Sequence, residues 1–298
     1  MDEEVRDRIC KRRTEKERLL TMPDNSRQAR DRILPLPGNL REVTKKGKLP
    51  NLSLKYYKYA KLYERSYDQK ARTQVINLVK DKTHFLQEFI ELSKQGGYAE
   101  AYDTRRKHLE SIGDGFSLTT ATRLLFGIGY QHPLEIGFMF DWTTGLPIIP
   151  GSSLKGIARD FAQNNTDLWD EGLVKKIFGP KDSADAHVGE IIFFPAFPCP
   201  DKARALFEID VMTPHYTRYY GNPTEDNPPA DWYSPVPIPF ITVPAGMRYC
   251  FRIADRTGFG KREDDSPLLK AAKAILRAAL TDHGVGAKTA VNYGYFSE

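Results

Sequence analysis

The sequence is poor in the residues and runs that would assign it to a specialised class. Its 298 residues include three cysteines, at positions 10, 199 and 250, and six histidines. The cysteines are odd in number, far apart and in no metal-ligand spacing, so they indicate neither a disulfide framework nor a structural zinc site. No run approaches the roughly 18 consecutive apolar residues of a membrane span, and residues 1–13 contain no apolar leader. We therefore expect a soluble, cytoplasmic protein with no membrane partner.

What the sequence does contain is enough apolar material for a core and an uneven distribution of charge. Hydrophobic residues make up 40% of the chain, which allows one large domain or two of ordinary size. The net charge is only +5, but residues 1–110 hold 26 basic and 17 acidic residues, whereas residues 111–298 hold 18 and 22. A basic N-terminal block is typical of a surface that meets a polyanion, and also of a solvated helical surface. Charge alone leaves both interpretations open.

The residue pattern divides the chain into three parts. Residues 1–50 are highly charged and contain a Leu-Pro repeat, which predicts a partly flexible segment. Residues 51–112 repeat apolar and tyrosine positions every three or four residues, which predicts a helical extension of two or three helices. Its tyrosines at 56, 59, 63 and 67 are typical of a core stripe, although tyrosines can also stack on bases. Glycines at 113 and 115 mark the expected domain boundary.

Beyond this boundary the pattern predicts an α+β domain, with helices on one face of a sheet. Expected strands cover 116–128, 134–140, 189–194, 206–212, 238–243, 248–254 and 289–296, and expected helices cover 152–163, 168–178 and 266–282. An insertion rich in proline and aromatics lies at about 195–244, which holds 11 of the 20 prolines. A loop of this length inside a compact domain is commonly functional.

One expected helix begins with hydroxyl and basic side chains, at Ser152, Ser153, Lys155 and Arg159. Ser152, Lys155 and Arg159 are three and four residues apart, so they share one stripe of the helix. A positive helix end with hydroxyls and two cations suits a phosphate group. The alternative is an ordinary capped helix with a lysine and an arginine on its surface.

A glycine-rich loop follows the last expected helix, with Gly284, Gly286, Lys288 and Thr289 as its distinctive residues. It is not a Walker loop, because Ala287 precedes the lysine and the order is helix then strand. A glycine cap on the preceding helix explains Gly284. Backbone N–H groups together with a lysine are also typical of a cradle for a nucleic-acid backbone. Both interpretations stay open.

Residues for catalysis are sparse. The histidines at 132, 187, 215 and 283 are scattered, with no paired metal spacing and no nucleophile elbow. Asp141 and Asp210 are candidate carboxylates, but each ends an expected strand, where turn capping is common. Metal-free RNA cleavage by a histidine general base is an alternative, with His132 and His215 as first candidates. We expect no catalytic residue, no metal and no cofactor.

Four motifs occur in the order found in the RAMP proteins of CRISPR systems. They are TRLLFGIG at 122–129, PGSSLKG at 150–156, IFG at 177–179 and GVGAKTAVNYGY at 284–295. The chain resembles this superfamily over residues 113–298. The segment DVMTPHYTRYY at 210–220 is similar to the sixth RAMP subunits of type III-B (Cmr) effector complexes. The N-terminal 110 residues carry no such motif.

The resemblance implies an RNA-recognition-like (ferredoxin-like) RAMP core with inserted loops and a non-catalytic subunit that binds CRISPR RNA. Such subunits cap the end that holds the guide 3′ region, beside backbone RAMP subunits, small helical subunits and another RAMP, and help to position target RNA. The helix start and the glycine loop are then expected to bind guide phosphates. Further expected RNA contacts are Arg123 and, on the proline-rich insertion acting as a thumb, His215, Tyr216, Arg218, Tyr219 and Trp232. The alternative is a RAMP endoribonuclease that processes CRISPR RNA precursors.

Overall fold

A computed structural model describes residues 32–33, 51–60, 62–68, 73–78, 82–95, 99–180, 187–199, 204–224, 226–230, 232–256 and 266–298. The chain forms two compact units, one of residues 1–37 and 61–80 and the other of residues 38–60 and 81–298. In the first unit, β1 (Arg32–Ile33), β2 (Tyr63–Asp68) and β3 (Thr73–Leu78) form an antiparallel sheet in the order β1-β2-β3.

The helical prediction for this part of the extension is wrong. Tyr63 pairs with Leu78 and Asp68 with Thr73 across two antiparallel strands. Both segments are rich in aromatic and β-branched residues, which favour a pleated sheet, and a tyrosine every fourth residue also satisfies the period of a strand. Three helices also lie between residues 51 and 112, namely α3 (Leu52–Tyr57), α4 (Thr83–Ser93) and α5 (Ala99–Ile112).

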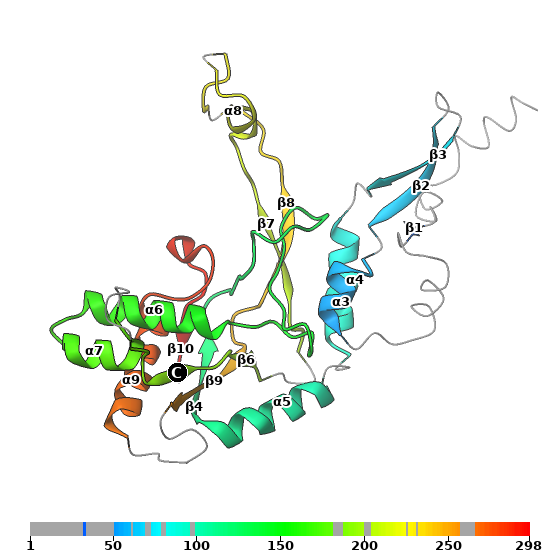
Figure 1. The fold of residues 1–298 in the computed structure, drawn as a ribbon. Coiled ribbons are helices and arrows are strands. Elements are labelled where there is room, and N and C mark those ends of the chain that lie inside the picture. Colours follow the sequence, from blue (N-terminus) through cyan, green and yellow to red (C-terminus); the bar gives the residue numbers. More distant parts are fainter. Residues whose placement is uncertain are drawn as a thin grey trace, which may run out of the picture. The chain divides into compact units, whose positions relative to one another are not determined.

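The second unit is built on an antiparallel sheet with the strand order β10-β4-β9-β5, to which β6 adds a short pairing with β9. The strands are β4 (Asp114–Thr120), β5 (Ile191–Phe193), β6 (Phe197–Pro198), β9 (Arg248–Asp255) and β10 (Phe296–Ser297). Helices α6 (Gly151–Asn164) and α7 (Glu171–Phe178) lie between β4 and β5 in the chain, and α9 (Pro267–Asp282) lies between β9 and β10 (Figure 1). The predicted mixture of helices and sheet is confirmed.

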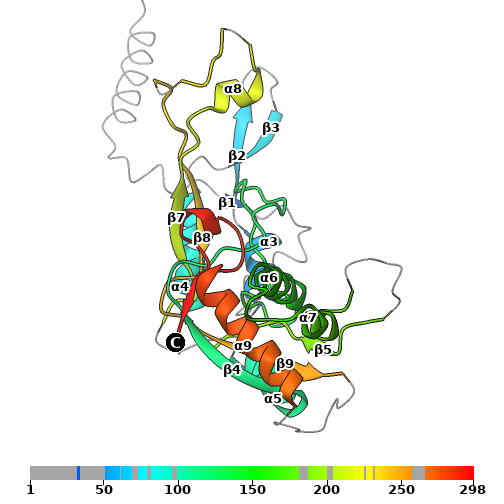
Figure 2. The same cartoon turned by 90° about the vertical axis from the view of Figure 1, so that its left-hand side faces the viewer.

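The two faces of this sheet differ because side chains alternate along β4 and β9. The buried face carries Leu118, Tyr249, Phe251 and Ile253, all almost fully inaccessible. It is covered by α6 and α9, which lie side by side (Figure 2) and contribute Leu154, Phe161, Ile275 and Leu276 to the core. The opposite face carries Ser117, Arg248, Cys250 and Arg252 and lies beside α5.

Several expected strands are confirmed and others are not. The expected strands at 206–212 and 238–243 are present as β7 (Glu208–Met212) and β8 (Ile238–Thr242), and the structure pairs them antiparallel inside the proline-rich insertion. Residues 134–140 form no strand beyond an isolated bridge between Phe140 and Pro147. In place of a strand over 289–296 there is a 3₁₀ turn, η2 (Thr289–Val291), followed by β10. Left-handed conformations at Lys288, Asn292 and Gly294 interrupt the extended backbone there.

Cys199 and Cys250 form a disulfide across 51 residues of sequence, so the interpretation of the cysteines as unpaired is wrong for these two. The bond joins the end of β6 to the neighbouring strand β9, where the N–H of Cys199 donates to the carbonyl of Arg248 at 2.7 Å. Two cysteines far apart in sequence become neighbours only through this strand pairing, which their spacing does not indicate. Cys10 lies outside the described residues. None of the described helices has the length and apolar character needed to cross a membrane.

Two glycines of α6 provide a test of this packing. A Cβ at Gly151 would lie 2.1 Å from the carbonyl oxygen of Phe193, whereas a Cβ at Gly156 would meet nothing within 4 Å. Gly151→Ala is therefore expected to lower the free energy of unfolding by about 1–3 kcal/mol through overpacking. Gly156→Ala is expected to raise it by about 0.5–1 kcal/mol, since alanine is the better helix former. Urea denaturation of both variants checks this, and equal effects would show that α6 does not approach β5 as described.

Candidate nucleic-acid interface

The first turn of α6 offers backbone donors without acceptors. The helix begins after Pro150, which provides no side-chain cap, and Ser152 and Ser153 lie inside the first turn instead of capping it. The first N–H groups of a helix have no acceptor within the helix. The N–H of Leu154 bonds to the Pro150 carbonyl, which leaves the N–H groups of residues 151–153 to an external acceptor. With the exposed hydroxyl of Ser152, this helix start can bind an anion.

Lys155 and Arg159 have different environments. Lys155 is half-buried, and its pKa is lowered by that burial and by the nearby charge of Arg159. No described carboxylate pairs with Lys155, so a bound anion would relieve the cost of placing its charge there. Arg159 instead donates through Nη2 to the carbonyls of Phe178 and Gly179, at the end of α7. It therefore holds α7 and adds positive potential beside Lys155.

The glycine loop combines a helix cap with free donors. Gly284 has a φ of 69° and its N–H bonds to the Ala279 carbonyl at 3.1 Å, so the glycine cap of α9 is confirmed. Beyond it, Gly286 has a φ of 102° and Lys288 a left-handed φ of 64°. No described acceptor pairs with the N–H groups of Gly286, Lys288 and Thr289, or with the ammonium of Lys288. Only the N–H groups of Lys288 and Thr289 are adjacent in the chain, and with the Lys288 ammonium they offer donors to an anion.

Backbone bonds fix this loop to the segment that begins with Arg123. The N–H of Ala287 donates to the Leu125 carbonyl at 2.8 Å, and the N–H of Gly294 donates to the Arg123 carbonyl at 2.7 Å. A Cβ at Gly286 would lie 2.5 Å from the Leu125 oxygen, so that glycine allows the close approach. Among the described residues, no hydrogen bond or ion pair joins the loop to the first turn of α6.

Arg123 lies at the base of the β7–β8 hairpin and is already paired. Its Nε is 2.6 Å from Glu208 Oε1 and its Nη1 is 3.1 Å from Asp210 Oδ2. The hydroxyl of Tyr293 also donates to Asp210. Burial and this bond to Asp210 raise the pKa of Tyr293 to about 12, so the phenol stays protonated at neutral pH. These residues line a cavity of about 590 Å³, together with Thr122, Arg204 and Asn292.

Sequence reasoning identified Arg123 but missed its partners. Glu208 and Asp210 are two residues apart on β7, so both point to the same face of the strand, and this spacing was the available signal. Tyr293 lies 83 residues further along the chain than Asp210. It becomes a partner only because the terminal loop folds back beside β7. The cluster fixes the hairpin to the core and neutralises the charge of Arg123 with two carboxylates.

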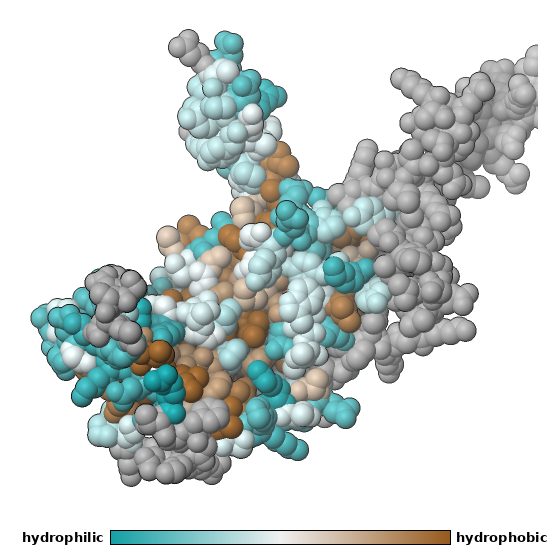
Figure 3. Space-filling view, viewed as in Figure 1, coloured by the Kyte–Doolittle hydropathy of each residue, from teal (hydrophilic) through white to brown (hydrophobic). Residues whose placement is uncertain are grey.

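The far end of the proline-rich insertion presents exposed aromatic side chains. Beyond β7 and β8 lies the short helix α8 (Thr217–Gly221), at the end of the hairpin remote from α6 and α9 (Figure 1). Trp232 is 77% exposed and Tyr220 is 72% exposed. The Arg218 guanidinium lies 5.3 Å from the centre of the Tyr233 ring. In the space-filling view the visible surface of this tip is mostly polar, without a large apolar patch (Figure 3). Predicted contacts His215, Tyr216 and Tyr219 lie in the same tip.

His132, a candidate general base, is a buried structural residue. Its ring stacks on Tyr56 with 4.2 Å between ring centres, its Nδ1 accepts from Leu134 N–H, and its Nε2 contacts the Tyr56 carbonyl at 2.9 Å. Burial lowers the pKa of His132 to about 4. Tyr56 is itself fully buried, as expected for a core tyrosine. Within the described ranges, no group of three His, Cys, Asp or Glu side chains is arranged to hold a metal ion.

These features can be compared with known proteins. A model of the RAMP superfamily matches residues 117–297, and the chain belongs to the RAMP superfamily. It is similar to the CRISPR system Cmr subunit Cmr6 of Pyrococcus furiosus, with 27% identity over 273 residues that cover 74% of this chain and 77% of that protein. Cmr6 of Saccharolobus solfataricus is 28% identical over 185 residues, which cover 61% of this chain and 56% of the relative.

A solved structure extends the likeness to three dimensions. One chain of the cryo-EM structure of the type III-B Cmr-beta complex bound to cognate target RNA matches with a TM-score of 0.51 at 26% identity. The match covers 75% of this chain and 77% of that chain. The resemblance that the four motifs carried is thereby confirmed, both for the RAMP superfamily and for the similarity to a subunit of the type III-B Cmr complex.

Proposed function

We propose that this chain is a non-catalytic, CRISPR-RNA-binding subunit of a type III-B effector complex. In this role it caps the end that holds the guide 3′ region and helps to position target RNA. Its partners are the guide and target RNA, backbone RAMP subunits, small helical subunits and another RAMP. The strand order β10-β4-β9-β5, with a helix after β4 and another after β9, is consistent with a ferredoxin-like core.

The observation that carries this proposal is a pair of sites whose N–H and ammonium donors have no acceptor among the described residues. The first turn of α6 combines free N–H groups, a serine hydroxyl and the unpaired Lys155. The terminal loop combines three free N–H groups with Lys288. Both recognise a phosphate through charge and backbone donors and neither reads a base, as expected where guide pairing supplies the sequence specificity.

The exposed hairpin tip fits the second part of the role. Its aromatic rings and Arg218 can stack on bases without sequence preference. Arg123 contributes by fixing the base of the hairpin through Glu208 and Asp210. Arg159 contributes by fixing α7 and by raising the positive potential near Lys155.

Charge reversal at the two sites tests the proposal. Lys155→Glu and Lys288→Glu are each expected to weaken RNA binding roughly tenfold, since each removes a phosphate contact. Each is also expected to make the plot of log affinity against log salt less steep, by about 0.7 or more in slope. Fluorescence anisotropy of the full chain with a labelled CRISPR RNA over a salt series measures both quantities. Gly286 is left unchanged, because a larger residue there would disturb the loop.

Lys176→Glu is the matched control, since Lys176 is an exposed lysine on α7 and makes no ion pair with a described residue. It is expected to change affinity less than twofold. Equal weakening by all three variants would show a general effect of net charge and would contradict the proposal. Cleavage of repeat RNA by the purified chain that is lost in His215→Ala would favour the processing endoribonuclease instead, because the buried His132 is unsuited to general-base catalysis.

A further inference from the structure

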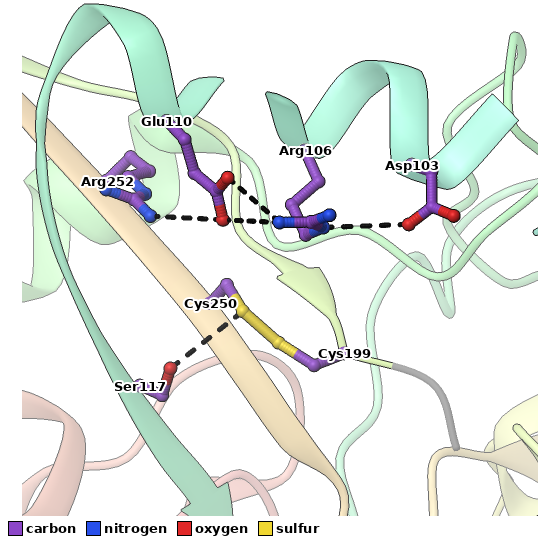
Figure 4. The surroundings of a disulfide bond; sticks show 7 residues. All are labelled: Asp103, Arg106, Glu110, Ser117, Cys199, Cys250 and Arg252. Atoms are coloured by element: carbon purple, nitrogen blue, oxygen red, sulfur yellow. Dashed lines mark hydrogen bonds and ion pairs between the residues drawn. A yellow bond between two sulfur atoms is a disulfide. The ribbon is translucent and has the colours of Figure 1, made fainter. Parts of the chain in front are cut away.

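A groove that is separate from both anion sites lies on the face of the main sheet that α6 and α9 leave uncovered. It has a volume of about 400 Å³ and is bounded by α5, β4 and β9. Its lining residues include Tyr102, Arg106, Arg248, Arg252 and Ser117. The Cys199–Cys250 disulfide forms part of its wall (Figure 4).

The strands present an unusual row of side chains to this groove. Gly115, Ser117 and Thr119 of β4 lie opposite Arg252, Cys250 and Arg248 of β9. These are the positions that alternate with the buried core residues, so all of them face away from α6 and α9. Two arginines on the central strand of a sheet, with small or hydroxyl-bearing residues opposite them, leave an open and positively charged surface.

Ion pairs along α5 hold two of the arginines in place. Arg106 Nη1 is 2.8 Å and 2.9 Å from the two carboxylate oxygens of Glu110, and Arg252 is 3.6 Å from the same carboxylate. Figure 4 shows this line of residues, from Arg252 through Glu110 and Arg106 to Asp103, passing beside the disulfide. The side chains are therefore preorganised, which reduces the entropy lost when a ligand binds.

The groove keeps positive charge in excess. Three arginines and one glutamate line it, and Arg248 is exposed with no ion-pair partner among the described residues. In an adjoining recess, the Nε–H of Arg105 is buried without an acceptor, with the guanidinium 5.9 Å from the centre of the Phe197 ring. An anionic ligand in the groove would supply Arg248 with the acceptor that it lacks among the described residues.

We propose that this groove binds a phosphodiester segment of single-stranded RNA, as a second RNA contact of the subunit. The inference rests on the proposed function and extends it to the opposite side of the sheet. Recognition is of the backbone, because the strand positions facing the groove carry no aromatic side chain, and of the two aromatic residues that line it Tyr102 is buried and Phe116 stacks on Phe251. Planar guanidinium groups and the Ser117 hydroxyl match phosphate oxygens.

The composition of the groove favours RNA over an acidic protein segment. Protein interfaces bury apolar anchors at their centre. The exposed large apolar residues of the described chain include Trp142, Leu168 and Trp232, and none of the exposed ones lines this groove. The surface therefore offers charge and hydrogen bonds without the apolar contact that a folded partner would use.

The test is charge reversal in the full-length chain. Arg248→Glu is expected to weaken binding of a fluorescent oligouridylate of about 20 nucleotides roughly tenfold, and to flatten the salt dependence by about 0.7 or more in slope. Arg248→Lys, which keeps the charge, is expected to recover most of the affinity. Lys107→Glu is the matched control, because Lys107 is an exposed basic residue on α5 that does not line the groove, and it is expected to change affinity less than twofold.

Lys155→Glu in the same assay separates this inference from the proposed function. If Lys155→Glu weakens binding and Arg248→Glu does not, the groove proposal fails and the proposed function stands. If neither weakens binding, both fail. Equal weakening by Arg248→Glu and Lys107→Glu would show that only the net charge of the chain matters, and would contradict the proposal that the groove binds RNA. So would unchanged RNA affinity of Arg248→Glu together with loss of a co-purifying subunit, because the groove would then bind protein.

Discussion

Reduction of the Cys199–Cys250 disulfide is expected to lower the free energy of unfolding by about 4 kcal/mol. The bond closes a loop of 51 residues, and the loss of loop-closure entropy in the unfolded chain gives a value of this order. Locally, β6 is a two-residue strand whose only strand partner among the described elements is β9, and the disulfide joins its end to that strand. Urea denaturation with and without a reductant measures the difference.

A double variant provides the matched control for this prediction. Cys199→Ser with Cys250→Ser is expected to reproduce the reduced stability and to respond no further to reductant. If the double variant is as stable as the oxidised chain, the disulfide contributes nothing to folding. If reductant still destabilises the double variant, the effect of reductant comes from elsewhere in the chain.

Acidification is expected to destabilise the protein through His132 by about 3 kcal/mol between pH 7 and pH 4. Burial lowers the pKa of His132 to about 4 in the folded state, against 6.5 in the unfolded chain. The unfolded chain therefore binds more protons in this interval, and stability falls as the pH falls. The contribution is fully present above pH 6.5, is lost progressively between pH 6.5 and 4, and changes little below that. Each unit of pKa difference corresponds to about 1.4 kcal/mol.

The check is the pH dependence of urea unfolding in His132→Gln, with His215→Gln as the exposed control. His132→Gln is expected to be less stable at pH 7, because it loses the stacking on Tyr56, and to show a flatter pH dependence than the parent chain. His215→Gln is expected to retain the parent curve. An unchanged pH slope in His132→Gln would assign the acid sensitivity to other groups and would leave His132 open to a catalytic role.

The basic residues of these sites are of two kinds, those already bonded to other residues and those without a described acceptor. At Arg123 and Arg159 the guanidinium groups are already bonded to carboxylates or carbonyls, so they act by holding a hairpin and a helix in place. The charged groups of Lys155, Lys288 and Arg248 pair with no described acceptor. Residues of the second kind are the ones whose reversal should change RNA affinity, because a ligand supplies their missing partner.

The helical signals of the RAMP region were readable without a structure. α6, α7 and α9 lie where the apolar periodicity placed them, because that periodicity, the N-cap side chains of Asp170 and Ser266 and the glycine at 284 act within one or two turns of the chain. The strands β7 and β8 also lie within the segments 206–212 and 238–243 where the residue pattern predicted them, although their pairing came from the structure. The four ordered motifs also sufficed to identify the superfamily.

The sequence predicted the length and the position of strands less well than those of helices. β2 and β3 were expected as helix because tyrosines in the first segment and apolar residues in the second recur every three or four positions. Tertiary pairing made both of them strands. The terminal segment after Lys288 was expected as one strand, yet left-handed residues divide it into a 3₁₀ turn and a two-residue strand.

The sequence by itself determined the order of helices and strands around the four motifs, the superfamily, and the positions of the cations. Only the tertiary structure decided which of those cations are already paired, which cysteines meet, and that Arg248 and Arg252 share one open face of the sheet with α5. The physical reason is range. Helix caps and periodicity depend on neighbours within a turn, whereas ion pairs, disulfides and grooves depend on the register between strands that are far apart in the chain.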